Sequence, residues 1–345
     1  MRLEHAILPA AGQAWPPFVL VAGLLLIGSV ASADGLFEAI GARLARAHLG
    51  ARGLLLSLLG LVAAVTAVLN LDTSVVFLTP VLVHTARRRA LDERPFLYGS
   101  VFMANAASLL LPGSNLTNLL VLRTNAQDSF AFAARMLPAW IAACAITAAF
   151  LTIVFRLEAC EVEDAEPPPM PFGVGLAATL AAAVLVVSLK NAALPVLAVG
   201  LAATALRRIR PRVDARLLVP LFVVAVGLGS GARLWHGPAN LLDSSGIWTA
   251  AGIGALASVL LNNLPAAVLF SAHPAAHPDA LLLGLDIGPN LAFTGSLSAV
   301  LWLQAARGVG AHPSLQDYSR LGAILVPLTL AATPAALLLA HLGGV

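Results

Sequence analysis

The chain has 345 residues, of which 59% are hydrophobic and 11% charged, and its formal net charge at pH 7 is +3. A soluble domain carries about 25% charged residues, and here apolar stretches close to the ~20 residues that cross a bilayer recur along the whole sequence, without the alternation of a membrane β-barrel. The arginines form short clusters beside apolar segments, as the positive-inside rule explains, so we predict an all-α polytopic membrane protein with no nucleic-acid partner.

The first half contains five predicted segments, two of which are interrupted by residues that break helices. The tip Asn70-Leu71-Asp72-Thr73 divides one apolar run, and residues 112–118 divide another. Irregular backbone at membrane depth survives only where protein or a water-filled cavity satisfies its polar groups. The predicted segments are a span at 17–33, an amphipathic interfacial helix at 34–52, a helical hairpin at 53–83, a broken span at 96–122 and a span at 136–155.

The second half follows an acidic, proline-rich linker at 156–170, which we expect to face the cytoplasm. It carries a second polar tip, Asn262-Asn263-Leu264-Pro265, and a run that is interrupted at 286–290 and again at 294–296. The predicted segments are scaffold spans within 171–234 (171–189, 195–206 and 217–234), a hairpin at 248–270, a broken span at 281–306 and a span at 321–342.

The two halves share one order of segments, which predicts two repeats, at 1–155 and 171–345. Interrupted segments at corresponding positions of two halves point to the binding site of a transporter. If each tip belongs to a re-entrant hairpin and 34–52 is cytoplasmic, the cytoplasmic stretches hold 15 of the 20 Lys and Arg residues, as the positive-inside rule requires. The hairpins then open to opposite sides, and we predict two inverted repeats, each with a re-entrant helical hairpin and a broken transmembrane helix.

Four groups of short motifs surround these breaks. They are Asn70-Leu-Asp72-Thr73 with Leu78-Thr79-Pro80, Ala107-Ser108 with Ser114-Asn115 and Asn118, Asn262-Asn263-Leu-Pro265, and Asp286-Ile-Gly288-Pro289 with Gly295-Ser296-Leu297 and Leu301-Trp302-Leu303. Together they resemble the signatures of the arsenite/antimonite efflux permease family, a branch of the ion-transporter superfamily that includes divalent-anion symporters and some sodium/proton antiporters. The resemblance runs from about Phe18 to the end of the sequence.

The resemblance implies export of arsenite or antimonite by a multi-pass protein of the cytoplasmic (inner) membrane. It also implies three scaffold spans before each hairpin, whereas we predict three in the second half and one in the first. The sequence contains no glycine-rich lysine motif for binding phosphate, so the chain cannot itself use ATP. A separate ATPase subunit and a homodimer are therefore expected as possible partners, beside the lipid bilayer, and we expect no cofactor and no metal.

Polar residues at the breaks form the predicted substrate site. A helix that starts at mid-membrane presents free N–H groups and the positive end of its dipole to a solute. Neutral donors and acceptors suit a small polyhydroxy solute such as As(OH)3 or Sb(OH)3, and no cysteine lies at the tips. The predicted substrate-binding residues are Asn70, Thr73, Gly113, Ser114, Asn115, Asn118, Asn262, Asn263, Gly295 and Ser296.

Asp72 and Asp286 are the acidic residues at membrane depth in these motifs. A carboxylate at the bilayer centre costs roughly 2.5–3.5 kcal/mol or more, which favours its neutral form and suits a proton carrier. We therefore predict that Asp72, together with Asp286, couples transport to protons. In the alternative interpretation each carboxylate only caps N–H groups of its own tip.

Other function classes stay open at this point. Within transport, the alternative is an anion or dicarboxylate symporter, or a sodium/proton antiporter. An intramembrane enzyme is disfavoured, because the sequence has no His-Glu-x-x-His motif and no histidine placed to pair with a serine in the spans. The remaining alternatives are a non-transporting scaffold or sensor, and a metal site at His273 and His277, which the adjacent Pro274 and Pro278 make more consistent with a loop.

Overall fold

The computed structural model describes residues 4–46, 49–122, 129–157, 169–189, 191–210 and 215–342, and within them every regular element is helical. The elements, in chain order, are α1 (Glu4–Ala33), α2 (Leu36–Arg46), α3 (Ala51–Leu69), α4 (Leu71–Arg88), α5 (Arg94–Ala107), η1 (Pro112–Ser114), α6 (Leu116–Leu122), α7 (Ser129–Val154), α8 (Val174–Ser188), α9 (Ala193–Arg207), α10 (Ala215–Leu234), α11 (Gly237–Asp243), α12 (Ile247–Leu261), α13 (Asn263–Ser271), α14 (Pro278–Ile287), η2 (Gly288–Leu291), η3 (Phe293–Gly295), α15 (Leu297–Gly308) and α16 (Leu315–Leu342).

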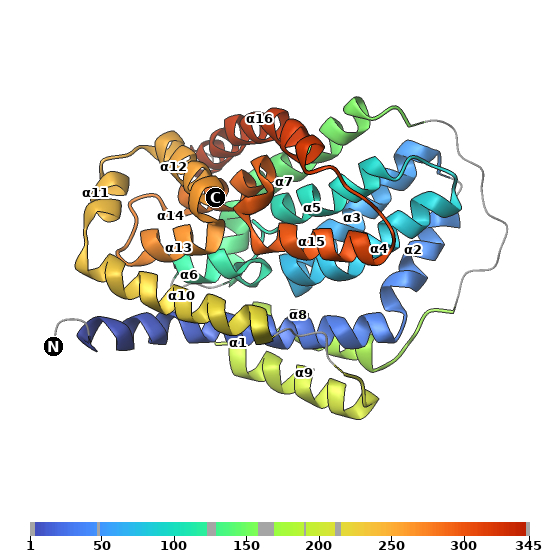
Figure 1. The fold of residues 1–345 in the computed structure, drawn as a ribbon, viewed down its shortest axis with the longest axis horizontal. Helices are drawn as coiled ribbons and strands as arrows, with labels where there is room; N and C mark the ends of the chain where they lie inside the picture. The colour runs from blue at the N-terminus through green and yellow to red at the C-terminus, as the bar shows by residue number, and fades with distance from the viewer. Residues whose placement is uncertain are drawn as a thin grey trace.

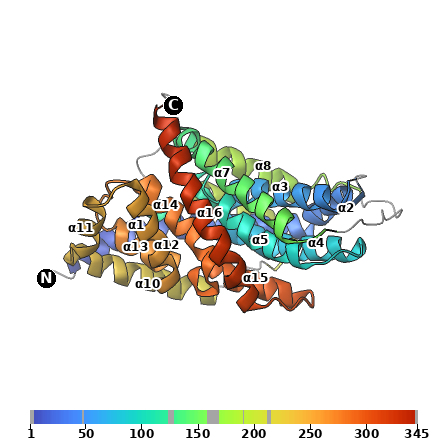
Figure 2. The same cartoon turned by 90° about the horizontal axis from the view of Figure 1, so that it is seen from above.

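One side of the molecule is a layer of long helices (Figure 1). There α1 packs lengthwise against α8, α9 and α10. In the described part of the chain, α1, α3, α7 and α16 are each long and apolar enough to cross a membrane, and α10 with α11 forms a bent apolar pair with an angle of 73°. Viewed from above, α16 crosses the molecule between the α11–α14 group and the α3–α5 group (Figure 2). This is a multi-pass membrane protein.

Two helical hairpins point into the molecule from opposite ends. The chain reverses at Asn70, since the Ser74 hydroxyl on α4 donates to the carbonyl of Val62 on α3 at 3.4 Å, although the two residues are 12 positions apart. In a continuous helix they would be separated by about 18 Å. At Asn262 the chain breaks in the same way between α12 and α13. Figure 1 shows α3 and α4 at one end of the long axis and α12 and α13 at the other.

The two broken helices tie the repeats together. The first consists of α5, η1 and α6, and the second of α14, η2, η3 and α15. Helix α4 of the first hairpin packs against α15, and helix α13 of the second hairpin packs against α6, so each hairpin contacts the broken helix of the other repeat. An aromatic cluster adds to this interface: Trp302 lies 5.7 Å from Tyr98 and 5.5 Å from Tyr318, between ring centroids. The predicted fold, two inverted repeats that each hold a hairpin and a broken helix, is confirmed.

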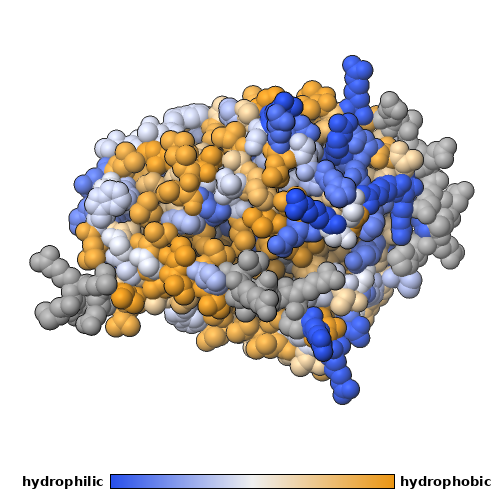
Figure 3. Space-filling model, in the orientation of Figure 1, coloured by the Kyte–Doolittle hydropathy of each residue, from blue (hydrophilic) through white to orange (hydrophobic). Residues whose placement is uncertain are grey.

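Arginine-rich loops gather at one end of the molecule. Arg89 donates hydrogen bonds to the carbonyls of Ala45 and Leu49, and Arg87 donates to the carbonyl of Val309 at 2.6 Å. Figure 3 shows the strongly hydrophilic side chains concentrated towards this end, while apolar side chains cover much of the remaining visible face. Of the stretches that the arginine count predicts to be cytoplasmic, 84–94 therefore contacts both 34–52 and 307–320.

The helices differ from the predicted segments mainly at their ends. Helix α1 begins at Glu4 rather than at 17, although it contains Pro9, Pro16 and Pro17. The short helix α11 was not predicted, because it follows His236 and begins with Gly237 and Pro238, which resemble a loop. The amphipathic helix expected at 34–52 is α2, which buries Leu36 and Phe37 and packs against α4. Most of the linker predicted at 156–170 lies outside the described residues.

Candidate functional site

Both hairpin tips turn on an asparagine with a left-handed backbone. Asn70 has φ 110° and ψ 168°, and Asn262 has φ 79° and ψ 146°. Such backbone is adopted almost only by glycine, and its strain of about 1–3 kcal/mol is typical of functional sites. Each asparagine offsets part of this cost by capping the helix that follows. The Oδ1 of Asn70 accepts from the Thr73 N–H at 2.8 Å, and the Oδ1 of Asn262 accepts from the Leu264 N–H at 3.3 Å.

The two tips and the two broken helices meet at a small cavity of about 20 Å³. Its polar lining comes from five side chains, Asp72, Asn115, Thr117, Asn263 and Ser298. The first two residues of α6, α13 and α15, and the second residue of α4, contribute to the wall. This volume holds about one water molecule, so the polar groups lie close together around a small space in this conformation.

Two carboxylates link elements from different repeats. Asp72 on α4 accepts a hydrogen bond from the Ser298 hydroxyl on α15 at 2.9 Å. Asp286, at the end of α14, is fully buried, and its Oδ1 accepts from the Asn115 side-chain amide at 2.8 Å and from the Thr117 hydroxyl at 2.7 Å. Asp72 therefore faces the cavity directly, whereas Asp286 reaches it through Asn115 and Thr117.

Several buried polar atoms around the site have no hydrogen-bond partner among the described residues. They are the Oδ2 of Asp286, the Oδ1 of Asn118, the Nδ2 of Asn70 and the Oγ1 of Thr73. Buried polar groups in proteins are almost always satisfied, by protein or by water. None of these four residues lines the cavity, so the unsatisfied atoms lie behind its wall.

The remaining predicted residues hold the breaks in place. The Ser114 hydroxyl donates to the carbonyl of Ala67 at the end of α3 at 3.2 Å, and the Asn262 amide donates to the carbonyl of Thr294 at 3.0 Å. Each broken helix is thus tied to the hairpin of its own repeat. Ser296 caps α15 by accepting from the Ala299 N–H, and the Asn118 amide donates to the carbonyl of Ser108 at 2.8 Å.

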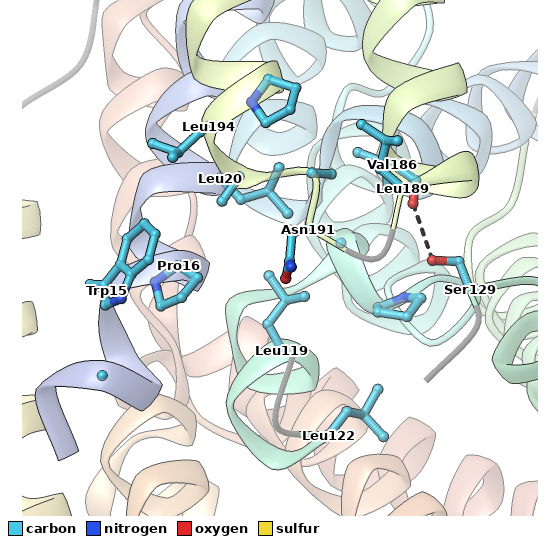
Figure 4. A pocket seen from close by; sticks show the side chains of 16 residues that line it. Trp15, Pro16, Leu20, Leu119, Leu122, Ser129, Val186, Leu189, Asn191 and Leu194 are labelled. Carbon is cyan, nitrogen blue, oxygen red and sulfur yellow. Dashed lines mark hydrogen bonds between the residues drawn. The ribbon is translucent and has the colours of Figure 1, made fainter. Parts of the chain in front are cut away.

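The glycines of the two breaks have different surroundings. A Cβ on Gly295 would lie 2.7 Å from the backbone of Pro289, so this glycine allows η2 and η3 to pack closely. Gly113 instead lines a second, larger cavity of about 570 Å³ between α1, α6 and the connection from α8 to α9. Figure 4 shows this cavity, with Trp15 and Leu20 on one wall and the Ser129–Val186 hydrogen bond (3.1 Å) on another. None of its lining residues is charged and none comes from a hairpin, so we place the candidate site at the smaller cavity.

Ser298 was missed by sequence reasoning, and Thr117 was not separated from ordinary packing residues. Asn105 and Asn290 form a further link, in which the Asn105 amide donates to the Oδ1 of Asn290 at 2.7 Å. A polar residue one or two positions after each break was the available signal for Thr117 and Ser298. Nothing in the sequence indicated which of them would meet a carboxylate from the other repeat.

The arrangement can bind a small polar solute through neutral groups. The starts of α4, α13 and α15 present N–H groups and positive dipole ends. The side chains add amide and hydroxyl groups, which both donate and accept, and the Asp72 carboxylate, which accepts. In the described part of the chain no three His, Cys, Asp or Glu side chains are close enough together to hold a metal ion. The cavity lining includes no lysine, arginine or histidine.

Comparison with known proteins gives consistent matches. The model of the CitMHS family, described as citrate transporter, matches residues 4–288. The arsenical pump membrane proteins of Yersinia enterocolitica and Escherichia coli K12 are each 25% identical over 370 residues, covering 94% of this chain and 86% of the relative. The solved YdaH transporter of Alcanivorax borkumensis covers 96% of this chain and 86% of its own, with a TM-score of 0.59 and 14% identity, which is a likeness of fold alone. These relatives confirm the resemblance indicated by the motifs.

Proposed function

The chain belongs to the CitMHS (citrate transporter) family of membrane transporters, and from this premise we propose that it exports arsenite or antimonite in exchange for protons. The observation that carries the proposal is the cavity where the starts of four helices meet, lined by amides, hydroxyls and one carboxylate. Those groups match a neutral trihydroxy solute, which donates and accepts at every oxygen. The relatives described as arsenical pumps support the same substrate class.

The second candidate is a carboxylate such as citrate, which the description of the family favours. Helix starts also attract anions. However, the Asp72 carboxylate lies in the cavity wall and no cationic side chain does, so a multiply charged anion would meet an uncompensated negative group. Like charges in a low-dielectric site repel strongly. We therefore rank the neutral solute first.

Proton coupling is assigned to Asp72 and Asp286. Both carboxyl groups lie at helix breaks, each bonded to a residue of the opposite repeat. In this proposal the protein resides in the cytoplasmic membrane with its arginine-rich end inside. Of the ten residues predicted to bind substrate, Asn115 and Asn263 line the cavity together with Thr117 and Ser298, and the others support the breaks around it. A separate ATPase or a second copy of the chain is a possible partner.

Transport by purified protein in liposomes tests the proposal. With an acidic medium outside, protons that enter the vesicles should drive arsenite out through the wild-type protein. Asp72→Asn should lower this arsenite flux at least about tenfold, because the lost interaction is worth more than about 1.4 kcal/mol in the transport cycle. Asp92→Asn is the control, since Asp92 pairs with Arg94 on the surface far from the site. Growth of a sensitive host on arsenite, with Asn263→Ala beside wild type, extends the test to cells.

The outcomes separate the candidates. If vesicles accumulate labelled citrate and show no arsenite flux, the carboxylate alternative replaces the metalloid. Coupling that survives intact in Asp72→Asn would remove Asp72 from the proton pathway and leave Asp286.

A further inference from the structure

Thr117 stands between the candidate cavity and the buried carboxylate of Asp286. It is the second residue of α6, it lines the cavity, and its hydroxyl donates to the Oδ1 of Asp286 at 2.7 Å. Thr117 is itself 1% exposed and Asp286 is fully buried. No other described side chain both lines the cavity and donates a hydroxyl to Asp286, since Asn115 contributes an amide.

A threonine hydroxyl has one hydrogen and two acceptor lone pairs. When Asp286 is charged, the hydrogen of Thr117 points to the carboxylate, as the 2.7 Å bond has it, and the lone pairs are left for the cavity. When Asp286 carries its proton on Oδ1, the carboxyl O–H donates to Thr117, and the hydroxyl hydrogen of Thr117 turns to the cavity. The amide hydrogens of Asn115 cannot reverse in this way, because an amide nitrogen only donates.

We propose that Thr117 is the positioning residue that links solute binding to the proton on Asp286. This inference rests on the proposed function. A hydroxyl of the bound solute donates to Thr117, which donates to the charged carboxylate, and chains that end on an ionised acceptor are stronger than neutral ones. Binding of a trihydroxy metalloid therefore expels the proton from Asp286 to water, as exchange requires. A solute that only accepts hydrogen bonds selects the opposite orientation and binds together with a proton.

Few other titratable groups face Asp286. Asp72 lies across the cavity, bonded to Ser298, and Arg135 pairs with Asp279 at the start of α14. Among the helices packed against α14, neither α6, α12 nor α13 contains a titratable residue. The other two helices carry Arg94 and Tyr98 on α5, and Asp317, Tyr318, Arg320 and His341 on α16.

The test is the pH dependence of arsenite binding to the purified full-length protein, measured by calorimetry between about pH 5.5 and 7.5. Because one proton competes with the solute, wild-type affinity should rise with pH, by up to about tenfold per unit. Thr117→Val removes the hydroxyl at nearly constant shape and should flatten this dependence to within about twofold over the range. Thr117→Ser should restore it, and Thr147→Val, a buried threonine that bonds only within α7, should leave it unchanged.

Infrared difference spectra of the wild-type protein provide a second readout that needs no folded Thr117 variant. Arsenite addition at low pH should remove a carboxylic-acid C=O band that is missing in Asp286→Asn. An unchanged pH dependence in Thr117→Val, or an unchanged Asp286 band in the wild type, overturns the relay. If the wild type binds no arsenite, the proposed function fails. The relay is then tested with citrate, whose affinity should decrease as pH rises, and more steeply in the wild type than in Thr117→Val.

Discussion

The first and second hairpin tips have the same backbone turn, an asparagine with positive φ, but their polar side chains differ in burial and in hydrogen-bond partners. Asn70 is 1% exposed and its amide nitrogen has no partner among the described residues, whereas Asn262 is half-buried and its amide donates to Thr294. The first tip continues with Asp72, and the second has Leu264 at the corresponding position. A repeat can therefore preserve a strained turn while only one tip keeps an ionisable group, and the second tip instead donates its amide to the broken helix of its own repeat.

The largest expected difference between the two repeats is in the stability lost when the glycine before Ser114 or Ser296 is replaced by alanine. Gly295→Ala should destabilise by about 1–3 kcal/mol and abolish transport, because its Cβ would lie 2.7 Å from the Pro289 backbone. Gly113→Ala should cost less than about 1 kcal/mol, since its Cβ would meet a Val186 methyl group at 3.0 Å. Thermal unfolding in detergent and vesicle transport measure both effects.

Gly252→Ala is the matched control for these substitutions. No atom lies within 4 Å of the Cβ it would add in α12, so it should stabilise the protein by up to about 1 kcal/mol. Equal losses of stability and transport in Gly113→Ala and Gly295→Ala would show that both breaks are packed equally tightly around their glycines.

A smaller difference is expected between the two tip asparagines. Asn70→Ala removes a 2.8 Å cap and leaves alanine in backbone that favours glycine, and should cost about 2 kcal/mol. Asn262→Ala removes a weaker 3.3 Å cap at a half-buried position and should cost about 1 kcal/mol. Asn70→Gly and Asn262→Gly should recover most of each loss, because glycine relieves the strain. Chemical or thermal unfolding in detergent measures both losses of stability. A larger loss in Asn262→Ala than in Asn70→Ala would contradict this comparison.

The smallest effects are expected at the serines of the breaks. Ser296→Ala removes the cap of α15 and should cost about 1 kcal/mol, and Ser296→Thr should restore it. Ser114→Ala removes one 3.2 Å bond to the Ala67 carbonyl and should cost about 0.5 kcal/mol. The same unfolding measurements apply, and a loss at Ser114 that exceeds the loss at Ser296 would mean that the tie to the hairpin outweighs the local cap.

The fold was largely predictable because the residues at each break are themselves unfavourable in an α-helix. Asn70 and Asn262 interrupt apolar runs, and the Pro-Gly-Ser of η1 and the Gly-Pro-Asn of η2 cannot continue a helix. The site was predictable only in part. The bonds from Thr117 to Asp286 and from Ser298 to Asp72 join residues 169 and 226 positions apart, and such pairs depend on packing between repeats. The short helix α11 and the N-terminal extension of α1 lacked any periodic or capping signal.

The bond between Asp72 and Ser298 has a consequence for biosynthesis. Its two partners are 226 residues apart, and a ribosome adds about 5–20 residues per second, so roughly 10–45 s pass before the first tip can meet its hydroxyl partner. During that interval the carboxyl group belongs to a half-made chain with no second repeat. The contact that ties the first tip to the second repeat therefore forms late, after the chain beyond Ser298 has been synthesised.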